Sequence, residues 1–392
     1  MELQISKLLN KIWYQFVGLV IIFFPIQFAQ LPFQQYFTNF IFGKWIAYLA
    51  IHIMHLPITT ITISSDSRAM YLLFFTLFIC SIAIHIIGLF LKKYNTTTLF
   101  ILLQKMALYY LAFHFCSYGF DKIVKQQFYL PEPNILYTNI GSLHKDILYW
   151  STIGTSSTYN VFLGIAEVLA GMMIIFRKTR LLGLVLAVGI LINVVAVNFC
   201  FDINVKLFAS FLLLISMIEL LAYRNLFLQK QKWTITIASL PIPHQQQLLF
   251  KILYFVIISI EIIYPSYIAN NWNDDIAPRP LLHGAYQIVN PITSKYWQQW
   301  SPKMVFMHKE NYIIFQQENG ETKDFKYCLD AKNKILQFSV AKNKIETMHF
   351  YQDTLHRQLL FIHQLDTLYC HALAWQKMNV LHNEFHWSVE DY

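Results

Sequence analysis

The chain has 392 residues, of which 56% are hydrophobic, 17% aromatic and only 13% charged. Soluble domains contain about 25% charged residues, so the charged fraction here is about half of the usual value. With a mean hydropathy of +0.41, this composition argues against a nucleic-acid-binding protein, a disordered chain and a disulfide-stapled module. The apolar excess lies in residues 1–267, whereas 268–392 have the composition of a soluble domain. The sequence therefore predicts an integral membrane protein with a soluble C-terminal domain.

About seven segments are long and apolar enough to form transmembrane helices, since such a helix needs about 20 mostly apolar residues. These predicted helices cover residues 12–30, 70–91, 97–118, 159–176, 181–199, 205–223 and 249–268. The stretch 40–63 is also apolar, but Lys44, His52 and His55 interrupt it, so we expect an interfacial or re-entrant helix there. If that stretch crosses the membrane instead, the chain has one more span and its N-terminus changes sides.

Basic residues favour the cytoplasmic side of a membrane and therefore predict the orientation of the chain. With the N-terminus inside, the cytoplasmic side collects most of them: Lys7, Lys11, Lys92, Lys93, Arg177, Lys178, Arg180, Arg224, Lys230 and Lys232. The other side receives fewer: Lys44, Arg68, Lys122, Lys125, Lys145 and Lys206. This bias predicts a cytoplasmic N-terminus and a C-terminal domain outside the cytoplasm.

The segment 270–392 begins with a polar linker and continues with the pattern of short antiparallel strands. Leu336 and Phe338 alternate with polar residues, which is typical of a half-buried strand. Asn319-Gly320 is a strong signal for a β-hairpin turn. We expect a small antiparallel barrel or sandwich, and favour the barrel because its closure removes exposed edge strands.

Glu167 is the clearest ionisable residue inside a predicted span, where such groups are costly and by default functional. Gly164, Glu167 and Gly171 share one helical face because they are spaced i, i+3 and i+7. Small residues allow two helices to approach closely, so Glu167 should face protein rather than lipid. Its carboxyl group then either supports packing by a hydrogen bond or handles a proton or ligand. We select Glu167 as the candidate catalytic residue.

A second polar group lies where one predicted helix ends and the next begins: Asn193, Asn198, Asp202, Asn204 and Lys206. A well-satisfied helical hairpin accounts for this pattern, because Asp202 or Asn204 would cap the next helix and Asp202 would pair with Lys206 at i, i+4. The functional alternative is a polar ligand-binding pocket just inside the outer leaflet, facing Glu167.

A third polar group follows the predicted helix 97–118 and its outer end, and comprises His114, Tyr118 and Lys122. Tyr110 and His114 have i, i+4 spacing and should stack. A single histidine in a membrane is more often hydrogen-bonded than a ligand. No two of the histidines that precede residue 120 share a predicted span, so we predict no metal site.

The five cysteines form no C-x-x-C motif and no zinc-binding spacing. Cys328 and Cys370 both lie in the domain predicted outside the cytoplasm, where a disulfide between them would persist. Because sequence does not give the distance between two strand residues, two free thiols are the alternative.

Residues of about 100–225 resemble the DoxX family of small bacterial membrane proteins. The likeness begins with Lys105 and an apolar helix that ends in Gly-x-x-Lys, here Gly119 and Lys122. It continues with the glycine-flanked Glu167 and the basic turn 177–180. The longer relatives found in Bacteroidetes-type bacteria are also similar around Tyr118-Gly119-Phe120 and Asn198-Phe199-Cys200-Phe201-Asp202.

The resemblance implies a division of the chain into four parts. Residues 1–96 would hold N-terminal helices and the interfacial segment, and 97–226 a DoxX-like core of four helices. Residues 227–269 would form a cytoplasmic loop and the last transmembrane helix, and 270–392 the β domain.

The resemblance also implies a function, since some DoxX proteins are linked to thiosulfate:quinone oxidoreductases. The chain would then be a quinone-linked redox component of the bacterial inner membrane, acting near the outer leaflet. In this interpretation Glu167 handles the proton, while Lys122 and Lys206 orient the quinone. One alternative is a non-enzymatic anchor whose β domain binds or assembles with a protein partner. A further alternative is the handling of a small molecule or lipid, and no nucleic-acid partner is expected.

Overall fold

A computed structural model describes residues 2–25, 33–57, 61–90, 96–223, 244–289, 295–298, 301–341, 344–364 and 366–382. The basic residues 92, 93, 224, 230 and 232 and most of the predicted cytoplasmic loop lie outside these described residues. The chain forms two compact units, each built from two segments. Met1–Val124 and Val161–Trp272 form the helical unit, and Lys125–Asn160 and Asn273–Tyr392 form the barrel unit.

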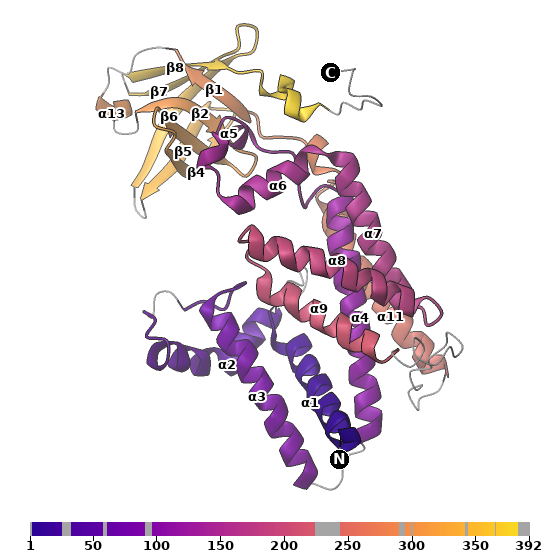
Figure 1. Ribbon diagram of the computed structural model, residues 1–392. Helices are drawn as coiled ribbons and strands as arrows, with labels where there is room; N and C mark the ends of the chain where they lie inside the picture. The colour runs from indigo at the N-terminus through magenta and orange to yellow at the C-terminus, as the bar shows by residue number, and fades with distance from the viewer. Residues whose placement is uncertain are drawn as a thin grey trace. The chain divides into compact units, whose positions relative to one another are not determined.

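The described helices of the helical unit are α1 (Glu2–Phe23), α2 (Phe33–His52), α3 (Arg68–Phe90), α4 (Thr96–Ile123), α7 (Ser157–Ile175), α8 (Arg180–Cys200), α9 (Lys206–Leu221), α11 (His244–Ile262) and α12 (Tyr264–Ile268) (Figure 1). Among the described residues, four stretches are long and apolar enough to cross a membrane: Arg68–Phe90, Thr98–Ile123, Ser157–Ile175 and Arg180–Cys200. The predicted helical membrane part is therefore confirmed. The number of seven spans stays a prediction.

The helix α2 lies where the sequence predicted an interfacial segment over 40–63, but it begins earlier and ends before His55. His55 has a φ of 52°, in the left-handed region that a continuing helix does not allow. Side chains of α2 satisfy carbonyl groups in the last turn of α1, since Thr38 donates to the oxygen of Phe23 over 2.7 Å and Gln34 to that of Ile21 over 3.0 Å. These bonds join the two helices through backbone groups that α1 leaves unpaired.

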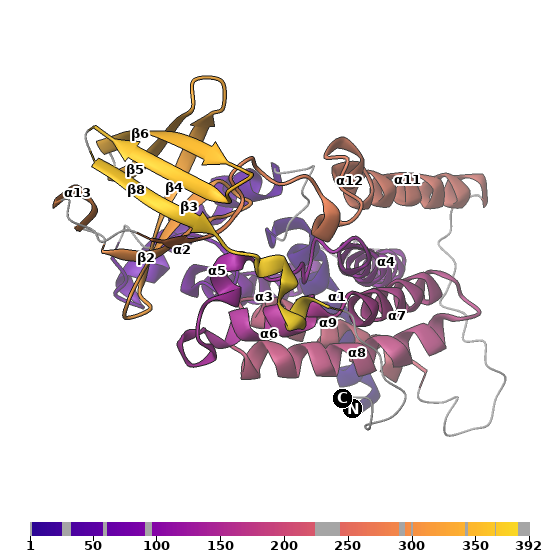
Figure 2. The same ribbon diagram turned by 90° about the horizontal axis from the view of Figure 1, so that it is seen from above.

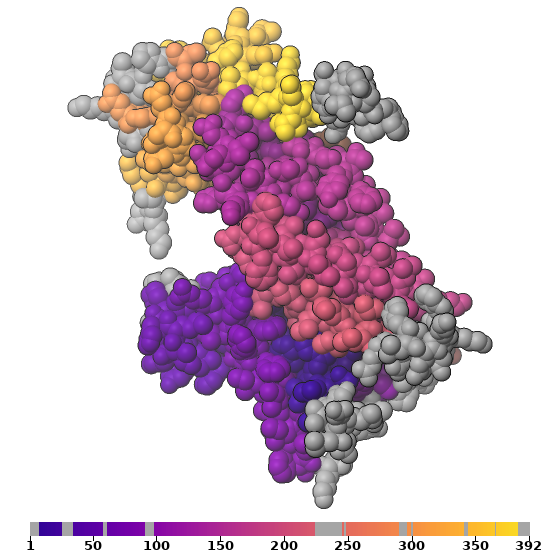
Figure 3. All heavy atoms as spheres, in the orientation of Figure 1, coloured from indigo at the N-terminus to yellow at the C-terminus, as the bar shows by residue number. Residues whose placement is uncertain are grey.

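Aromatic side chains fill the space between the helices. The Phe16 ring of α1 contacts Phe74 of α3 and Phe211 of α9, with centroids 5.0 Å and 5.9 Å apart. The helices α8 and α9 lie side by side and form one continuous part of the surface (Figure 3). Large apolar side chains of these two helices are exposed: Leu182, Val185, Leu186, Ile192, Leu214, Met217 and Leu221. An apolar outer surface of this kind suits contact with lipid.

The barrel unit contains a closed antiparallel barrel in which each strand pairs with the next and the last strand pairs with the first. Its strands are β1 (Gly284–Ile288), β2 (Pro302–Met307), β3 (Tyr312–Gln317), β4 (Thr322–Asp330), β5 (Ile335–Ala341), β6 (Lys344–Asp353), β7 (Gln358–His363) and β8 (Asp366–Ala372). The predicted barrel is confirmed. Leu336 and Phe338 are buried inside it, and Gly320 has a φ of 86° in the predicted hairpin turn between β3 and β4.

The interior of the barrel is filled with apolar and aromatic side chains. The short helix α13 (Lys295–Gln298) lies at one end of the strands (Figure 2). Its Trp297 is 1% exposed and belongs to the apolar cluster inside the barrel. The segment 125–160, with the helices α5 (Pro133–Leu136) and α6 (Lys145–Thr155), belongs to the same unit. On the outer face of the barrel, Tyr137 packs against a cluster that includes Phe306, so the loop covers apolar strand residues.

The disulfide considered between Cys328 and Cys370 is not formed, and both residues are free thiols. Cys328 is exposed on β4, whereas Cys370 is buried inside the barrel on β8. In the barrel, Cys328 is paired with Gln337 and Cys370 with Leu359, so the two cysteines lie on different strand pairs and opposite faces. Of the two alternatives left open by the sequence, the structure has the two free thiols, because strand residues on opposite faces point their Cβ atoms apart.

Candidate functional site

The helices α4 and α7 approach each other closely through glycines. A Cβ atom on Gly119 would lie 2.6 Å from the carbonyl oxygen of Gly164, and one on Gly164 would lie 2.5 Å from that of Gly119. Gly171, two turns further along α7, leaves only 2.9 Å between a Cβ atom and the carbonyl oxygen of Ala112. The predicted small-residue face of α7 is therefore confirmed as the surface that packs against α4.

Glu167 lies on this face and forms an ion pair with Lys122 of α4. The distance between Lys122 Nζ and Glu167 Oε2 is 2.7 Å, and the two side chains are 8% and 9% exposed. A buried lysine and a buried carboxylate are each costly in a low-dielectric interior, so each requires the other. The structure therefore joins two of the residues that the sequence selected, and Glu167 faces protein as predicted.

Tyr118 and Asp121 add to the polar character around this pair. Both interact electrostatically with Glu167, and Lys122 Nζ lies 6.0 Å from the centroid of the Tyr118 ring. Asp121 therefore lies within electrostatic range of both members of the pair, and the set of Lys122, Glu167 and Asp121 carries one negative charge when all three are ionised. Binding of one proton makes the set neutral.

His114 lies one turn before Tyr118 in a cage of aromatic rings. Its ring centroid is 4.4 Å from that of Tyr110, as the i, i+4 spacing predicted, and 4.8 Å from that of Phe208 of α9. Tyr118 stacks on the other side with a centroid distance of 5.9 Å. Nε2 of His114 is buried, and among the described residues it has no hydrogen-bond partner.

The remaining candidates do not all lie in one pocket. Asn193 is exposed on α8, so it does not line a closed site. Asn198 is 4% exposed, and within the described part of the chain its Nδ2 has no hydrogen-bond partner. Asp202 and Lys206 form the predicted i, i+4 ion pair at 2.7 Å, but the Asp202 side chain is 84% exposed. This pair belongs to the turn between α8 and α9.

The N-terminus of α9 is capped by a residue that the sequence analysis missed. The carboxylate of Asp66 accepts hydrogen bonds from the backbone N–H groups of Lys206 and Leu207, over 2.7 Å and 3.0 Å. The expectation that Asp202 or Asn204 caps this helix is therefore wrong. Asp66 lies far away in the sequence, before α3, so no local pattern connects it to α9.

Glu219 is a second buried carboxyl group that the sequence analysis missed, although it interrupts the apolar run of α9. It is 1% exposed. Its Oε1 accepts a hydrogen bond from the Tyr14 hydroxyl over 2.6 Å, and its Oε2 accepts one from Gln104 Nε2 over 3.2 Å. The rule that selected Glu167, an ionisable residue inside an apolar helix, would have selected Glu219 as well.

The barrel unit contains a partly buried ionic network that joins its two chain segments. Glu132 of the segment 125–160 accepts a hydrogen bond from His283 Nε2 over 2.8 Å. Burial opposes ionisation of Glu132, but this bond and the charges of His308 and Lys309 outweigh it, so the pKa of Glu132 lies below its usual value. Lys125 Nζ lies 3.3 Å from Asp275 and donates to two backbone carbonyls of its own segment.

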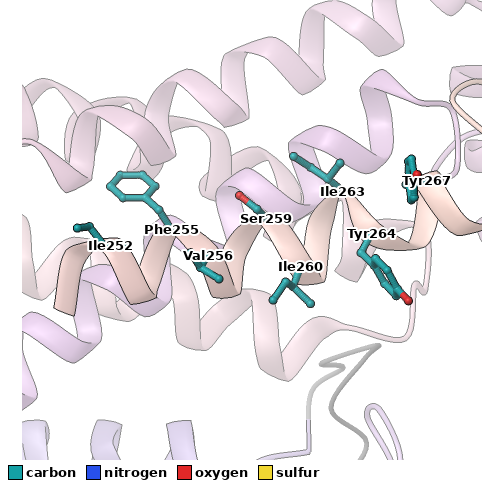
Figure 4. Close-up of a pocket in the computed structure, with 8 residues that line it drawn as sticks. All are labelled: Ile252, Phe255, Val256, Ser259, Ile260, Ile263, Tyr264 and Tyr267. Atoms are coloured by element: carbon teal, nitrogen blue, oxygen red, sulfur yellow. The ribbon is translucent and has the colours of Figure 1, made fainter. Parts of the chain in front are cut away.

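Among the described residues, no group of three or more His, Cys, Asp or Glu side chains could hold a metal ion. The described part of the helical unit contains a groove and a small cavity. An open groove of about 510 Å³ runs along α11 and α12, where Phe255, Ser259 and Ile263 lie along one side of the helix and Ile260 and Tyr264 along another (Figure 4). A second, small cavity lies among α1, α3 and α4.

Comparison with known proteins finds a curated relative that is similar enough to show the family of the chain. The uncharacterized protein YwoB of Bacillus subtilis (strain 168) is 33% identical over 119 residues, which are 30% of this chain and 75% of that protein. The chain belongs to the same family as YwoB. No family model and no solved structure matches the chain. YwoB is itself uncharacterized, so membership of the chain in this family adds no substrate or partner.

Proposed function

We propose that this member of the YwoB family is an integral membrane protein that binds and releases a proton at Lys122, Glu167 and Asp121 during quinone-linked redox chemistry. The observation that carries the proposal is the buried ion pair of Lys122 and Glu167, 2.7 Å apart at the closest contact of α4 and α7. Asp121 adds a second carboxyl group within electrostatic range of the pair. One proton therefore decides whether the set is charged or neutral.

The quinone is the part of the proposal that rests on the resemblance to DoxX proteins. Reduction of a quinone consumes protons and its oxidation releases them, so a quinone site needs a group that exchanges protons close by. The aromatic rings of Tyr118, Tyr110 and Phe208 around His114 supply the apolar surroundings that a quinone ring prefers. The electrons would come from a donor on a partner subunit.

The test replaces Glu167 by Gln and follows two quantities in the purified protein: its quinone content, and the reduction of added quinone by a chemical electron donor supplied in the assay. Gln keeps the shape of the side chain but removes the carboxylate that Lys122 pairs with at 2.7 Å, and breaking a buried ion pair destabilises a protein by about 3–5 kcal/mol. The double variant Lys122→Met with Glu167→Gln removes both charges and should keep the fold. We expect both variants to lose quinone-linked activity. Glu261→Gln, which changes a buried glutamate of α11, is the matched control and should stay active.

Full activity in the folded double variant would contradict the proton role of the pair. Lipid extraction of the wild-type protein tests the quinone separately. A preparation that holds no quinone and also fails to reduce added quinone with the supplied electron donor would contradict that part.

A second function is favoured by the connection of the two units. The chain passes between them after Val124, after Asn160 and after Trp272. Three covalent connections therefore join the barrel unit to the helical unit, whereas a single linker would provide only one. In this alternative the helices present the barrel to a protein partner, and stable co-purification of one protein with the wild type but not with a chain lacking residues 284–372 would support it.

A further inference from the structure

The small cavity in the helical unit has a volume of about 20 Å³. It is lined by Lys11, Tyr14 and Gln15 of α1, by His85 of α3 and by apolar residues at the start of α4. A cavity needs about 10–15 Å³ to hold a water molecule, so this one has room for a single water. The start of α1, the end of α3 and the start of α4 lie at the same end of the helical unit (Figure 1).

Two polar atoms at this cavity are buried and unsatisfied. In the part of the chain that the structure describes, neither Oε1 of Gln15 nor Nε2 of His85 has a hydrogen-bond partner. His85 is 7% exposed, so bulk water does not replace the missing partner. A buried water molecule normally bonds two to four such groups. The cavity therefore has both the space and the polar atoms that hold one.

Tyr14 connects the cavity to the interior of the helical unit. It lines the cavity, and its hydroxyl donates a hydrogen bond of 2.6 Å to Oε1 of Glu219. Glu219 is thus separated from the cavity by one side chain that can pass on a proton. On its other side Glu219 accepts a bond from Gln104, which neither binds nor releases a proton in water.

We propose that the cavity binds a water molecule between Gln15, His85 and Tyr14, and that this water and the Tyr14 hydroxyl form the path by which Glu219 takes up a proton. The proton reaches the water from the solvent at the end of the helices where Lys11 and His85 lie. The water passes a proton to the oxygen of Tyr14, whose own hydroxyl proton moves to Oε1 of Glu219. The water and the tyrosine end unchanged, and the carboxylate becomes a carboxylic acid.

The charged surroundings of Glu219 fit such a path. Glu219 bonds to Tyr14 and Gln104 and also interacts electrostatically with the cationic Arg180. Tyr223 interacts electrostatically with both Arg180 and Glu219. The Arg180 guanidinium donates hydrogen bonds to the carbonyl oxygens of Ile174 and Ile175, over 2.9 Å and 3.2 Å. Glu219 therefore has the attraction of a cation without a direct ion pair, and a proton can come and go without separating two bonded charges. This site does not depend on the function proposed for Glu167.

Infrared spectroscopy of the purified full-length protein tests the path. The C=O stretch of a protonated carboxyl group shifts in D2O, and the rate of that shift measures how fast solvent protons reach the group. The band that Glu219→Gln removes identifies Glu219. We expect exchange at this band to slow at least about tenfold in Tyr14→Phe, the rate equivalent of one lost hydrogen bond. His85→Phe, which fills the cavity, should have the same effect.

His52→Phe is the matched control, because it makes the same change at an exposed histidine of α2 and should leave the exchange rate unchanged. Equal rates in the wild type, Tyr14→Phe and His85→Phe would overturn the path, as would the absence of any band that Glu219→Gln removes. If the variants do not fold, a high-resolution structure of the wild type decides the matter. Density for a water bonded to His85 supports the proposal, and a dry cavity overturns it.

Discussion

Two lysines that lie close together in the sequence have different tasks in the structure. Lys122, in the last turn of α4, pairs with Glu167 in the helical unit. Lys125 follows the helix with a φ of 59°, is fully buried in the barrel unit, and donates to the carbonyl oxygens of Phe128 and Gly154. The end of α4 lies between them, so their side chains leave the backbone in unrelated directions. Charge alone did not distinguish the two residues, and only their partners do.

Glu132 makes the stability of the barrel unit depend on pH. Its pKa in the folded protein lies below the ordinary 4.5, so ionisation stabilises the fold. This contribution is complete above pH 4.5 and is lost as the pH falls through the lowered folded pKa. We expect Glu132→Gln to reduce the stability by about 1.5–3 kcal/mol at neutral pH, the range for a hydrogen bond to a charged group. The difference from wild type should shrink in acid.

Hydrogen exchange of the barrel strands in the full chain, corrected for the intrinsic effect of pH, measures this difference. Glu318→Gln is the control, because Glu318 is exposed and its replacement should change little at any pH. A stability difference between wild type and Glu132→Gln that is the same in acid and at neutral pH would contradict the assignment.

At the scale of elements, the sequence predicted which face of α7 packs against protein, because the residues that define this face follow the helical period; it did not predict α4 as the partner. Gly164, Glu167 and Gly171 share a face by backbone geometry alone, and that face packs against another helix. The cap of α9 was not predictable in the same way. Its acceptor, Asp66, comes from a segment that packing brings next to the α8–α9 turn.

Gly119→Ala should weaken the contact of α4 and α7. The added methyl group would lie 2.6 Å from a backbone oxygen that cannot turn away, so the helices must separate. Overpacking of this kind costs about 1–3 kcal/mol. The free energy of unfolding in mixed detergent micelles measures it. Gly189→Ala is the control, because nothing lies within 4 Å of a Cβ atom there, and it should be neutral or stabilising by up to about 1 kcal/mol.

An equal loss of stability in Gly119→Ala and Gly189→Ala would show that the cost comes from the helix backbone and not from the α4–α7 contact. Because separation of α4 and α7 would also lengthen the distance between Lys122 and Glu167, we expect Gly119→Ala to reduce the function proposed for that ion pair as well.

At the scale of the whole molecule, the units do not follow simple sequence boundaries. The stretch between the predicted helices 97–118 and 159–176 mostly belongs to the barrel unit, because the segment 125–160 packs on the strands and bonds to residues after 272. Composition could not reveal this, since a loop that covers strands and a loop that faces water have similar residues. The contacts of Tyr137 and Glu132 decide the matter.

The orientation of the chain is the prediction that belongs to the whole molecule. Cys328, exposed on the barrel, should react with a membrane-impermeant thiol reagent added outside intact cells. Lys178→Cys, in the exposed basic turn between α7 and α8, should react only after the membrane is opened. A Cys200→Ser background removes the other exposed thiol, and Cys328→Ser is the blank. Labelling of residue 178 from outside would reverse the predicted orientation.

The sequence by itself determined the helical membrane part, the C-terminal barrel and the face of α7 that carries Glu167. These features depend on the periods of helix and strand, which the backbone imposes within a few residues. Only the tertiary structure decided which groups meet. It paired Glu219 with Tyr14, placed Asp66 at α9, kept Cys328 and Cys370 apart and joined the segment 125–160 to the barrel. Such pairings depend on the packing of distant elements, which no local pattern records.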